Sequence, residues 1–264
     1  MEKIVYSYDS VSFFAAVVVC GILSIRIIVP PNHTPKASAW KSDSIAFYAG
    51  NNAFIYMSIT AVSALNLYYA ALVVSPPATA ARICPVGTTA RLNQELFAWS
   101  PTTIASFLAI LVGAPLRLGA FHGLGRNFTF GLAKPSGLVT DGIYRYIQHP
   151  SYTGIFLVAV AAAATFFRPD GAAACLIPTK YGPLIDAWLP TAYAGLGLLT
   201  VLQIYTRVSQ EEAMLKELFG KEWIQWNKHG TPITKPINIY IEDLGQTIII
   251  FEGHVSFCMR FSVV

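Results

Sequence analysis

Charged residues are scarce in this chain of 264 residues. Asp, Glu, Lys and Arg make up 12% of it, whereas hydrophobic residues make up 54%. Soluble domains usually carry about 25% charged residues. This deficit excludes an ordinary water-soluble domain and favours a protein embedded in a bilayer. The sequence also lacks a basic cluster interleaved with aromatic residues, so nucleic acid is not expected as a partner.

Cysteine is also rare, and its spacing excludes two common roles. The four cysteines are scattered, and no two stand at CxxC spacing. Zinc ribbons and thioredoxin-like redox sites are therefore excluded. Cys20 and Cys175 lie in apolar surroundings, where a free cysteine usually serves as a small packing residue. No metal site is predicted.

Five apolar segments approach the length of about 20 residues that a helix needs to cross a bilayer. The third contains Gly113-Ala114-Pro115, which predicts a break in that helix and places Arg117 beyond it, at the interface. The fifth passes directly into a polar helix over residues 207–226. The sequence therefore predicts an all-α, polytopic membrane bundle of about five transmembrane helices with a C-terminal cytosolic helix. The segments are residues 11–29, 53–74, 103–121, 150–167 and 186–205.

Three parts are expected along the chain. Residues 1–116 form N-terminal transmembrane helices, 117–230 form a core with the site, and 231–264 form a tail of unknown role. Most lysines and arginines follow the first, third and fifth spans, with Lys36 and Lys41 after the first. The positive-inside rule makes those segments cytosolic and places the N-terminus on the lumenal side.

A polar stretch that contains a histidine–proline pair stands directly before the fourth span. Its hinge is His149-Pro150. The residue before a proline avoids the helical region, and proline itself suits the first helical turn. A helix is therefore expected to begin at Pro150 with His149 at its mouth. The unpaired N–H groups of that first turn would favour a carboxylate or phosphate nearby.

Polar residues fall in two clusters on one predicted face of the membrane, before the fourth span and after the fifth. Charged groups so close to a bilayer are costly unless paired or functional. An interfacial aromatic belt and an ordinary surface ion pair are the plainer interpretations, and both stay open. The functional hypothesis is that both clusters line one cavity. The residues are Tyr144, His149, Ser151 and Tyr152 in the first cluster, and Arg207, Glu211 and Glu212 in the second.

The order of these motifs adds a resemblance. Residues 117–128 read Arg-Leu-Gly-Ala-Phe-His-Gly-Leu-Gly-Arg-Asn-Phe, and His149-Pro150-Ser151-Tyr152 follows. After a further span come Arg207 and Glu211-Glu212. Over residues 117–228 this pattern resembles the isoprenylcysteine carboxyl methyltransferase family of endoplasmic-reticulum membranes. The His-Pro-x-Tyr and Arg-x-x-x-Glu-Glu elements are typical of the wider membrane methyltransferase superfamily.

The resemblance implies methyl esterification of the C-terminal prenylated cysteine carboxylate of CaaX-processed proteins, with S-adenosylmethionine as cofactor. It implies a multi-pass protein of the endoplasmic-reticulum membrane, in contact with lipid, whose active site faces the cytosol. Arg207 would position the substrate carboxylate, and Glu211 would hold the ammonium of the cofactor. The cofactor-binding residues implied are Ser136, Gly137, Leu138, Val139, Tyr144, His149, Pro150, Ser151, Tyr152, Glu211 and Glu212.

Two positions depart from the family pattern. Ser136 stands where the family usually has a histidine, and Gln148 stands where it usually has an arginine. Three alternatives stay open. They are a phospholipid N-methyltransferase acting on phosphatidylethanolamine, a sterol reductase of related architecture, and an inactive membrane relative.

Overall fold

The computed structural model describes residues 8–32, 43–45, 51–84, 86, 89–229, 239–240 and 248–249. Within these ranges the regular secondary structure is helical, except for two short strands, β1 (Ile239–Tyr240) and β2 (Ile248–Ile249), which pair antiparallel. Lys36 and Lys41 lie outside the described residues. So does the predicted tail, residues 231–264, apart from the four strand residues.

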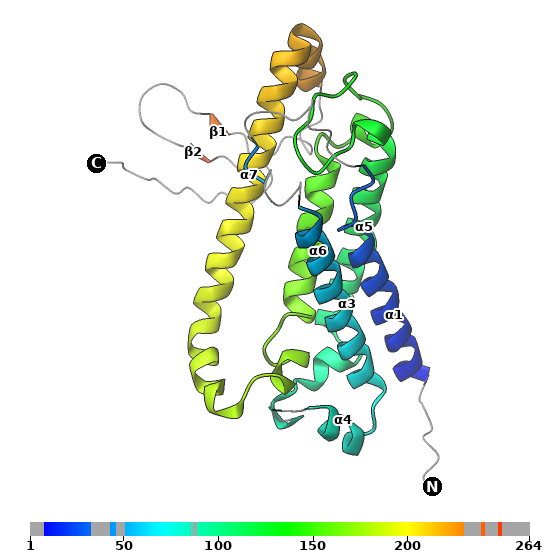
Figure 1. Ribbon diagram of the computed structural model, residues 1–264, viewed down its shortest axis with the longest axis vertical. Coiled ribbons are helices and arrows are strands. Elements are labelled where there is room, and N and C mark those ends of the chain that lie inside the picture. Colours follow the sequence, from blue (N-terminus) through cyan, green and yellow to red (C-terminus); the bar gives the residue numbers. More distant parts are fainter. Residues whose placement is uncertain are drawn as a thin grey trace, which may run out of the picture.

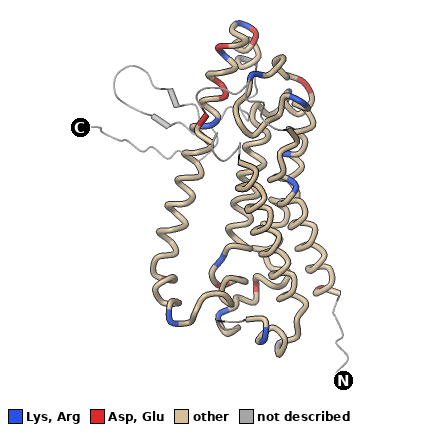
Figure 2. The backbone as a smooth tube through the Cα atoms, in the orientation of Figure 1, with Lys and Arg blue, Asp and Glu red and all other residues tan. Residues whose placement is uncertain are grey.

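Five main helices run along the long axis of the molecule (Figure 1). Four of them are long and apolar enough to cross a membrane, and the fifth, α6, is apolar but shorter. Lys, Arg, Asp and Glu gather mainly toward the two ends of the bundle (Figure 2). The predicted all-α membrane bundle is confirmed. The helices are α1 (Tyr8–Arg26), α3 (Asn52–Val74), α5 (Pro101–Leu124), α6 (Pro150–Thr165) and α7 (Gly182–His229).

Short helical elements connect the main helices at both ends of the bundle. Between α3 and α5 lie α4 (Pro77–Ile83), η2 (Thr89–Arg91) and η3 (Gln94–Phe97). Between α5 and α6 lie η4 (Gly125–Asn127) and η5 (Gly142–Arg145). Between α6 and α7 lie η6 (Ala172–Cys175) and η7 (Thr179–Tyr181).

The predicted break in the third span is wrong. Helix α5 begins with a capping box between Ser100 and Thr103 and continues through Pro115. Proline is tolerated inside membrane helices because neighbouring groups satisfy the backbone that it frees. Arg117, which was expected beyond the break, is buried inside the bundle and 7% exposed. Its guanidinium is enclosed between α1 and α6.

Helices α5 and α6 approach each other closely enough for backbone contact. A Cβ atom on Gly154 would lie 2.4 Å from the carbonyl oxygen of Gly113 and 2.8 Å from the nitrogen of Arg117. A Cβ atom on Gly113 would lie 2.7 Å from the carbonyl oxygen of Gly154. Small residues permit such crossings in membranes, where close packing drives helix association. This crossing fixes where the first turn of α6 lies.

The end of the bundle far from the His149-Pro150 hinge is tied together by its loops. Cys84 and Cys175 form a disulfide. The backbone N–H of Asn93 donates to the carbonyl oxygen of Asp170 (2.8 Å). The prediction that Cys175 only fills space is therefore wrong, because two connections that are 91 residues apart meet here. Cys20, in contrast, is free and buried, as predicted.

Helix α7 passes from the apolar span directly into a polar helix, as predicted, but that polar helix is interrupted before residue 226. Its one non-helical residue is Gly220, with φ 46°, a left-handed conformation that favours glycine. The chain turns there (Figure 1). The residues that follow, up to His229, end beside the start of α6, where the Gln148 amide donates to the Asn227 side-chain oxygen (3.0 Å).

Replacing Gly154 by valine should break the α5–α6 crossing, because the added carbons would overlap the backbone of α5. Overpacking of this kind typically costs about 1–3 kcal/mol. We expect a clear drop in the thermal unfolding midpoint of the detergent-purified protein. Gly197→Ala is the matched control, since a Cβ there meets nothing within 4 Å. Equal midpoints for both variants would contradict the crossing.

Candidate active site

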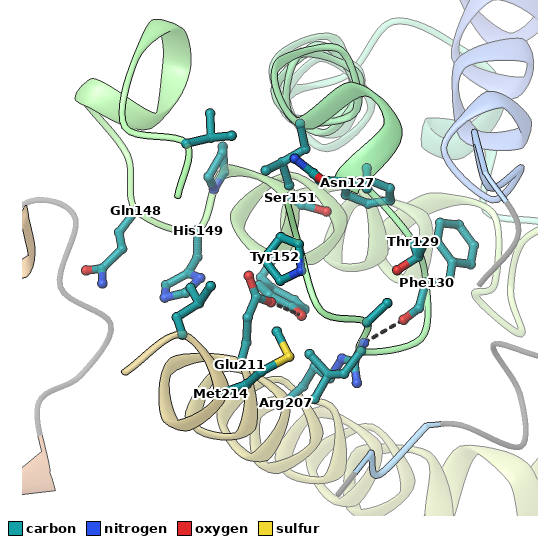
Figure 3. A pocket seen from close by; sticks show the side chains of 18 of the residues that line it. Asn127, Thr129, Phe130, Gln148, His149, Ser151, Tyr152, Arg207, Glu211 and Met214 are labelled. Carbon is teal, nitrogen blue, oxygen red and sulfur yellow. Dashed lines mark hydrogen bonds between the residues drawn. The ribbon is translucent and has the colours of Figure 1, made fainter. Parts of the chain in front are cut away.

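A cavity of about 350 Å³ lies at the end of the bundle where α6 begins (Figure 3). Its walls come from the connection between α5 and α6, the first turn of α6, and the middle of α7. Ile45 adds a side chain from the N-terminal part of the chain. The volume falls within the range of about 300–1,000 Å³ that is usual for small-molecule sites.

The His149-Pro150 hinge supplies one wall of the cavity. Helix α6 begins at Pro150 as predicted, and the side chain of His149 makes no capping hydrogen bond to it. The imidazole Nε2 lies 2.9 Å from the Glu212 carboxylate instead. The hydroxyl of Tyr152 donates to the Glu211 carboxylate at 2.7 Å, and Figure 3 shows these two side chains facing each other. The start of α6 is thus joined to α7 by two polar contacts.

Helix α6 spans 16 residues. At about 1.5 Å per residue it is roughly 24 Å long, shorter than a hydrocarbon core of about 30 Å. The polar first turn therefore lies close to the boundary between lipid and water. Such a position suits a site that serves one water-soluble and one lipid-soluble reactant.

Arg117 forms the back of the cavity. Its Nη1 donates to the Ser151 hydroxyl (2.7 Å), and its Nε donates to the Ile27 carbonyl (3.0 Å). Its guanidinium carbon also lies 5.1 Å from the Phe121 ring centroid and 5.2 Å from that of Phe130. Within the described part of the chain no carboxylate forms an ion pair with it. The cavity wall therefore holds a positive charge that, among the described residues, contacts only neutral groups.

Arg207 is 4% exposed and lines the same cavity as His149. Its Nη1 pairs with the Asp43 carboxylate at 2.5 Å, and its Nη2 donates to the Phe130 carbonyl at 2.6 Å. Its Nε is buried and has no hydrogen-bond partner among the described residues. The guanidinium is fixed by two partners, and its Nε–H is left without one among the described residues.

Asp43 and Arg117 are the residues that sequence reasoning missed. Asp43 is 164 residues from Arg207, and nothing in the sequence connects them. A signal existed for Arg117, because it opens the motif on which the resemblance rests. The prediction placed it at the interface beyond a break at Pro115, so its burial at the cavity wall was not foreseen.

Apolar and aromatic side chains line much of the rest of the cavity. Leu138 and Val139 come from the connection before α6, and Met214 and Trp226 come from α7. Tyr144 is buried, and burial together with the negative charge of Glu211 raises the pKa of its hydroxyl well above that of free tyrosine. It therefore stays neutral at physiological pH.

Most of the predicted cofactor residues gather at this cavity, together with Arg207. Ser136 and Glu212 are not among its lining residues. The backbone N–H and hydroxyl of Ser136 both donate to the Asn127 side-chain oxygen (3.0 Å each), which supports the wall from outside. The predicted residues that line the cavity are Gly137, Leu138, Val139, Tyr144, His149, Pro150, Ser151, Tyr152, Arg207 and Glu211. The role of each residue stays a prediction.

The fold and the cavity together define a multi-pass membrane protein. At one end of its helices lies a buried small-molecule site that is lined in part by ionisable side chains. Residues 105–185 match the model of the Isoprenylcysteine carboxyl methyltransferase (ICMT) family. The resemblance seen in the motifs is thereby confirmed, and the match includes the α5–α6 crossing and the His149-Pro150 hinge.

Curated relatives point the same way. The chain is 29% identical over 141 residues to the protein-S-isoprenylcysteine O-methyltransferase of Schizosaccharomyces pombe, covering 52% of this chain and 50% of that protein. It is 26% identical over 145 residues to the human protein of the same name, covering 52% and 43%. With protein-S-isoprenylcysteine O-methyltransferase A of Arabidopsis thaliana it shares 27% over 123 residues, covering 45% and 52%.

The chain thus spans about half the length of the curated relatives it matches. No solved structure matches it. The name of the matched family implies a methyl donor for its members.

Proposed function

We propose that this protein transfers a methyl group from S-adenosylmethionine to the C-terminal carboxylate of prenylated cysteine, in proteins processed at a CaaX sequence. One observation carries the proposal. His149, at the start of α6, and Arg207, on α7, line one cavity although they are far apart in the sequence. The family match and the names of the relatives support the same reaction.

The chemistry of the cavity fits S-adenosylmethionine. When bound, this cofactor supplies an electrophilic methyl group on a sulfonium. Glu211, oriented by the Tyr152 hydroxyl, offers a carboxylate to its ammonium group. Tyr144 and Trp226 offer aromatic surface for its adenine. His149, held by Glu212, would close the remaining side and exclude water.

The acceptor needs orientation rather than activation. A C-terminal carboxylate has a reference pKa of about 3.5, so it is ionised at pH 7 and needs no general base. Arg207 has a buried Nε–H without a partner, and Arg117 brings a second positive charge to the wall. These two cations would attract the carboxylate and hold it in line for transfer.

The prenyl chain would bind beside apolar helix surfaces. Ile155 on α6 and Ile204 on α7 line the cavity on the side that leads to the apolar parts of both helices. Each buried CH₂ group contributes about 0.8 kcal/mol. Most of the affinity for a farnesyl or geranylgeranyl acceptor would therefore come from the chain, and the carboxylate would supply orientation.

A phospholipid N-methyltransferase is the second candidate. Its acceptor is an amine that carries a positive charge at neutral pH and must lose a proton before it can accept a methyl group. Arg117, which has no carboxylate partner among the described residues, would repel such a group at the cavity wall. The observed charges therefore favour the carboxylate acceptor.

The proposed location is the endoplasmic-reticulum membrane, with the cavity facing the cytosol. The positive-inside rule supports this orientation. The disulfide between Cys84 and Cys175, at the opposite end of the bundle, supports it independently. Disulfides persist in oxidising compartments such as the lumen and are rare in the cytosol.

Arg207→Ala and Glu211→Ala should fail in different ways. Loss of Glu211 removes the partner of the cofactor ammonium, so the Kd for labelled S-adenosylmethionine should rise about 30-fold or more. Loss of Arg207 should leave that Kd within about threefold, while kcat/KM for farnesylcysteine falls about 100-fold. Both quantities are measured on the purified protein.

Lys216→Ala is the matched control, because Lys216 is an exposed residue of the same helix. It should leave both constants unchanged. Near-normal turnover by the Arg207 and Glu211 variants would contradict the proposed site.

The orientation can be tested by cysteine labelling in sealed microsomes, whose outer face is cytosolic. In a Cys258→Ser background, Lys216→Cys should react with a membrane-impermeant maleimide. Glu95→Cys, in the loop beside the disulfide, should react only after detergent is added. The reverse pattern would contradict the orientation.

A further inference from the structure

Three consecutive residues from the N-terminal part of the chain, 43–45, lie along the face of α7 that carries Arg207. The backbone N–H of Ser44 donates to the Gln210 side-chain oxygen (3.0 Å), and the Gln203 amide donates to the Ser44 hydroxyl (3.1 Å). Gln203, Arg207 and Gln210 are spaced four and three apart, so they share one helix face. The segment is therefore fixed to α7 on both sides of the arginine.

The carboxylate of Asp43 joins three parts of the site. One oxygen accepts from Nη1 of Arg207 (2.5 Å) and from the backbone N–H of Ile45 (2.9 Å). The other accepts from the backbone N–H of Leu132 (2.7 Å). The side chain is 4% exposed. Because both oxygens are bound, the carboxylate is held in one orientation.

This arrangement determines how Arg207 meets a ligand. Nη1 donates to the Asp43 carboxylate, and Nη2 donates to the Phe130 carbonyl. These two bonds fix the plane of the guanidinium. Asp43 also places a negative charge beside the positive charge of Arg207. An anionic ligand at the cavity is therefore attracted less strongly than it would be by an unpaired arginine.

We propose that Asp43 is a positioning residue that acts through Arg207, holding the guanidinium and weakening its ground-state grip on the acceptor carboxylate. This inference rests on the proposed methyl transfer to a carboxylate. As the ester forms, the carboxylate loses its negative charge, so a strong clamp on the free anion would raise the barrier. Asp43 lies outside residues 105–185, which match the family, and so it is a contribution of the N-terminal part.

The test is a split between KM and kcat in Asp43→Asn. Asparagine is nearly isosteric and keeps one of the two acceptor oxygens, but its NH₂ group cannot accept at the other position, and it leaves the charge of Arg207 uncompensated. We expect the KM for farnesylcysteine to fall about threefold or more, and kcat to fall about tenfold, because tighter ground-state binding is not matched in the transition state. A purely structural role would raise KM or leave it unchanged.

Two further variants separate charge from anchoring. Ser44→Ala removes the hydrogen bond from Gln203 but leaves the carboxylate, so both constants should stay at the wild-type values. Asp43→Glu keeps the negative charge beside Arg207, so its KM should stay at the wild-type value. Binding of labelled S-adenosylmethionine with the wild-type Kd shows that each variant is folded.

The outcomes are distinct. Lower KM with lower kcat in Asp43→Asn supports the proposal, and unchanged or raised KM overturns it. If Asp43→Asn does not bind S-adenosylmethionine, Asp43→Glu decides, because a changed KM in that variant overturns the role of the charge. Failure of the wild-type protein to methylate farnesylcysteine is a different result, which ends the proposed function itself.

Discussion

The backbone contact between α5 and α6 is the constraint on which the site depends. Gly113 and Gly154 allow the two helices to approach until neither position can carry a side chain. That approach places the Ser151 hydroxyl 2.7 Å from Nη1 of Arg117 and encloses a charged side chain within a lipid-embedded bundle. The same first turn directs Tyr152 toward α7 and its Glu211. A longer side chain at the crossing would move the hinge and both contacts together.

Charge is distributed unevenly around the cavity, and the distribution has chemical meaning. Glu211 faces a tyrosine hydroxyl, so its charge remains for a cationic ligand group. Arg207 is balanced by Asp43, whereas Arg117 is surrounded by neutral groups within the described residues. Buried charges are costly unless they are paired or functional. The negative charge of Glu211 and the positive charge of Arg117 therefore have no oppositely charged partner among the described residues of the cavity. Such a cavity is suited to bind a cationic methyl donor and an anionic acceptor together.

Much of the fold could be predicted because lipid imposes long apolar runs, which mark helices plainly. The His149-Pro150 hinge also acts locally, through the restricted backbone of proline. The break expected at Pro115 was wrong because a neighbouring helix can satisfy the freed backbone, and a sequence does not show neighbours. The Asp43–Arg207 pair and the Cys84–Cys175 disulfide could not be predicted for a related reason. Each joins segments that only the packed helices bring together.

The central claim is that this cavity methylates a carboxylate, and the bond that forms can be identified directly. Purified protein is incubated with methyl-labelled S-adenosylmethionine and either farnesylcysteine or phosphatidylethanolamine, and the product is treated with alkali. A methyl ester is hydrolysed and releases labelled methanol, whereas an N-methyl group is stable. The account predicts alkali-labile label on farnesylcysteine, and none on its C-terminal amide. Alkali-stable label on the phospholipid, or no label on farnesylcysteine, would contradict it.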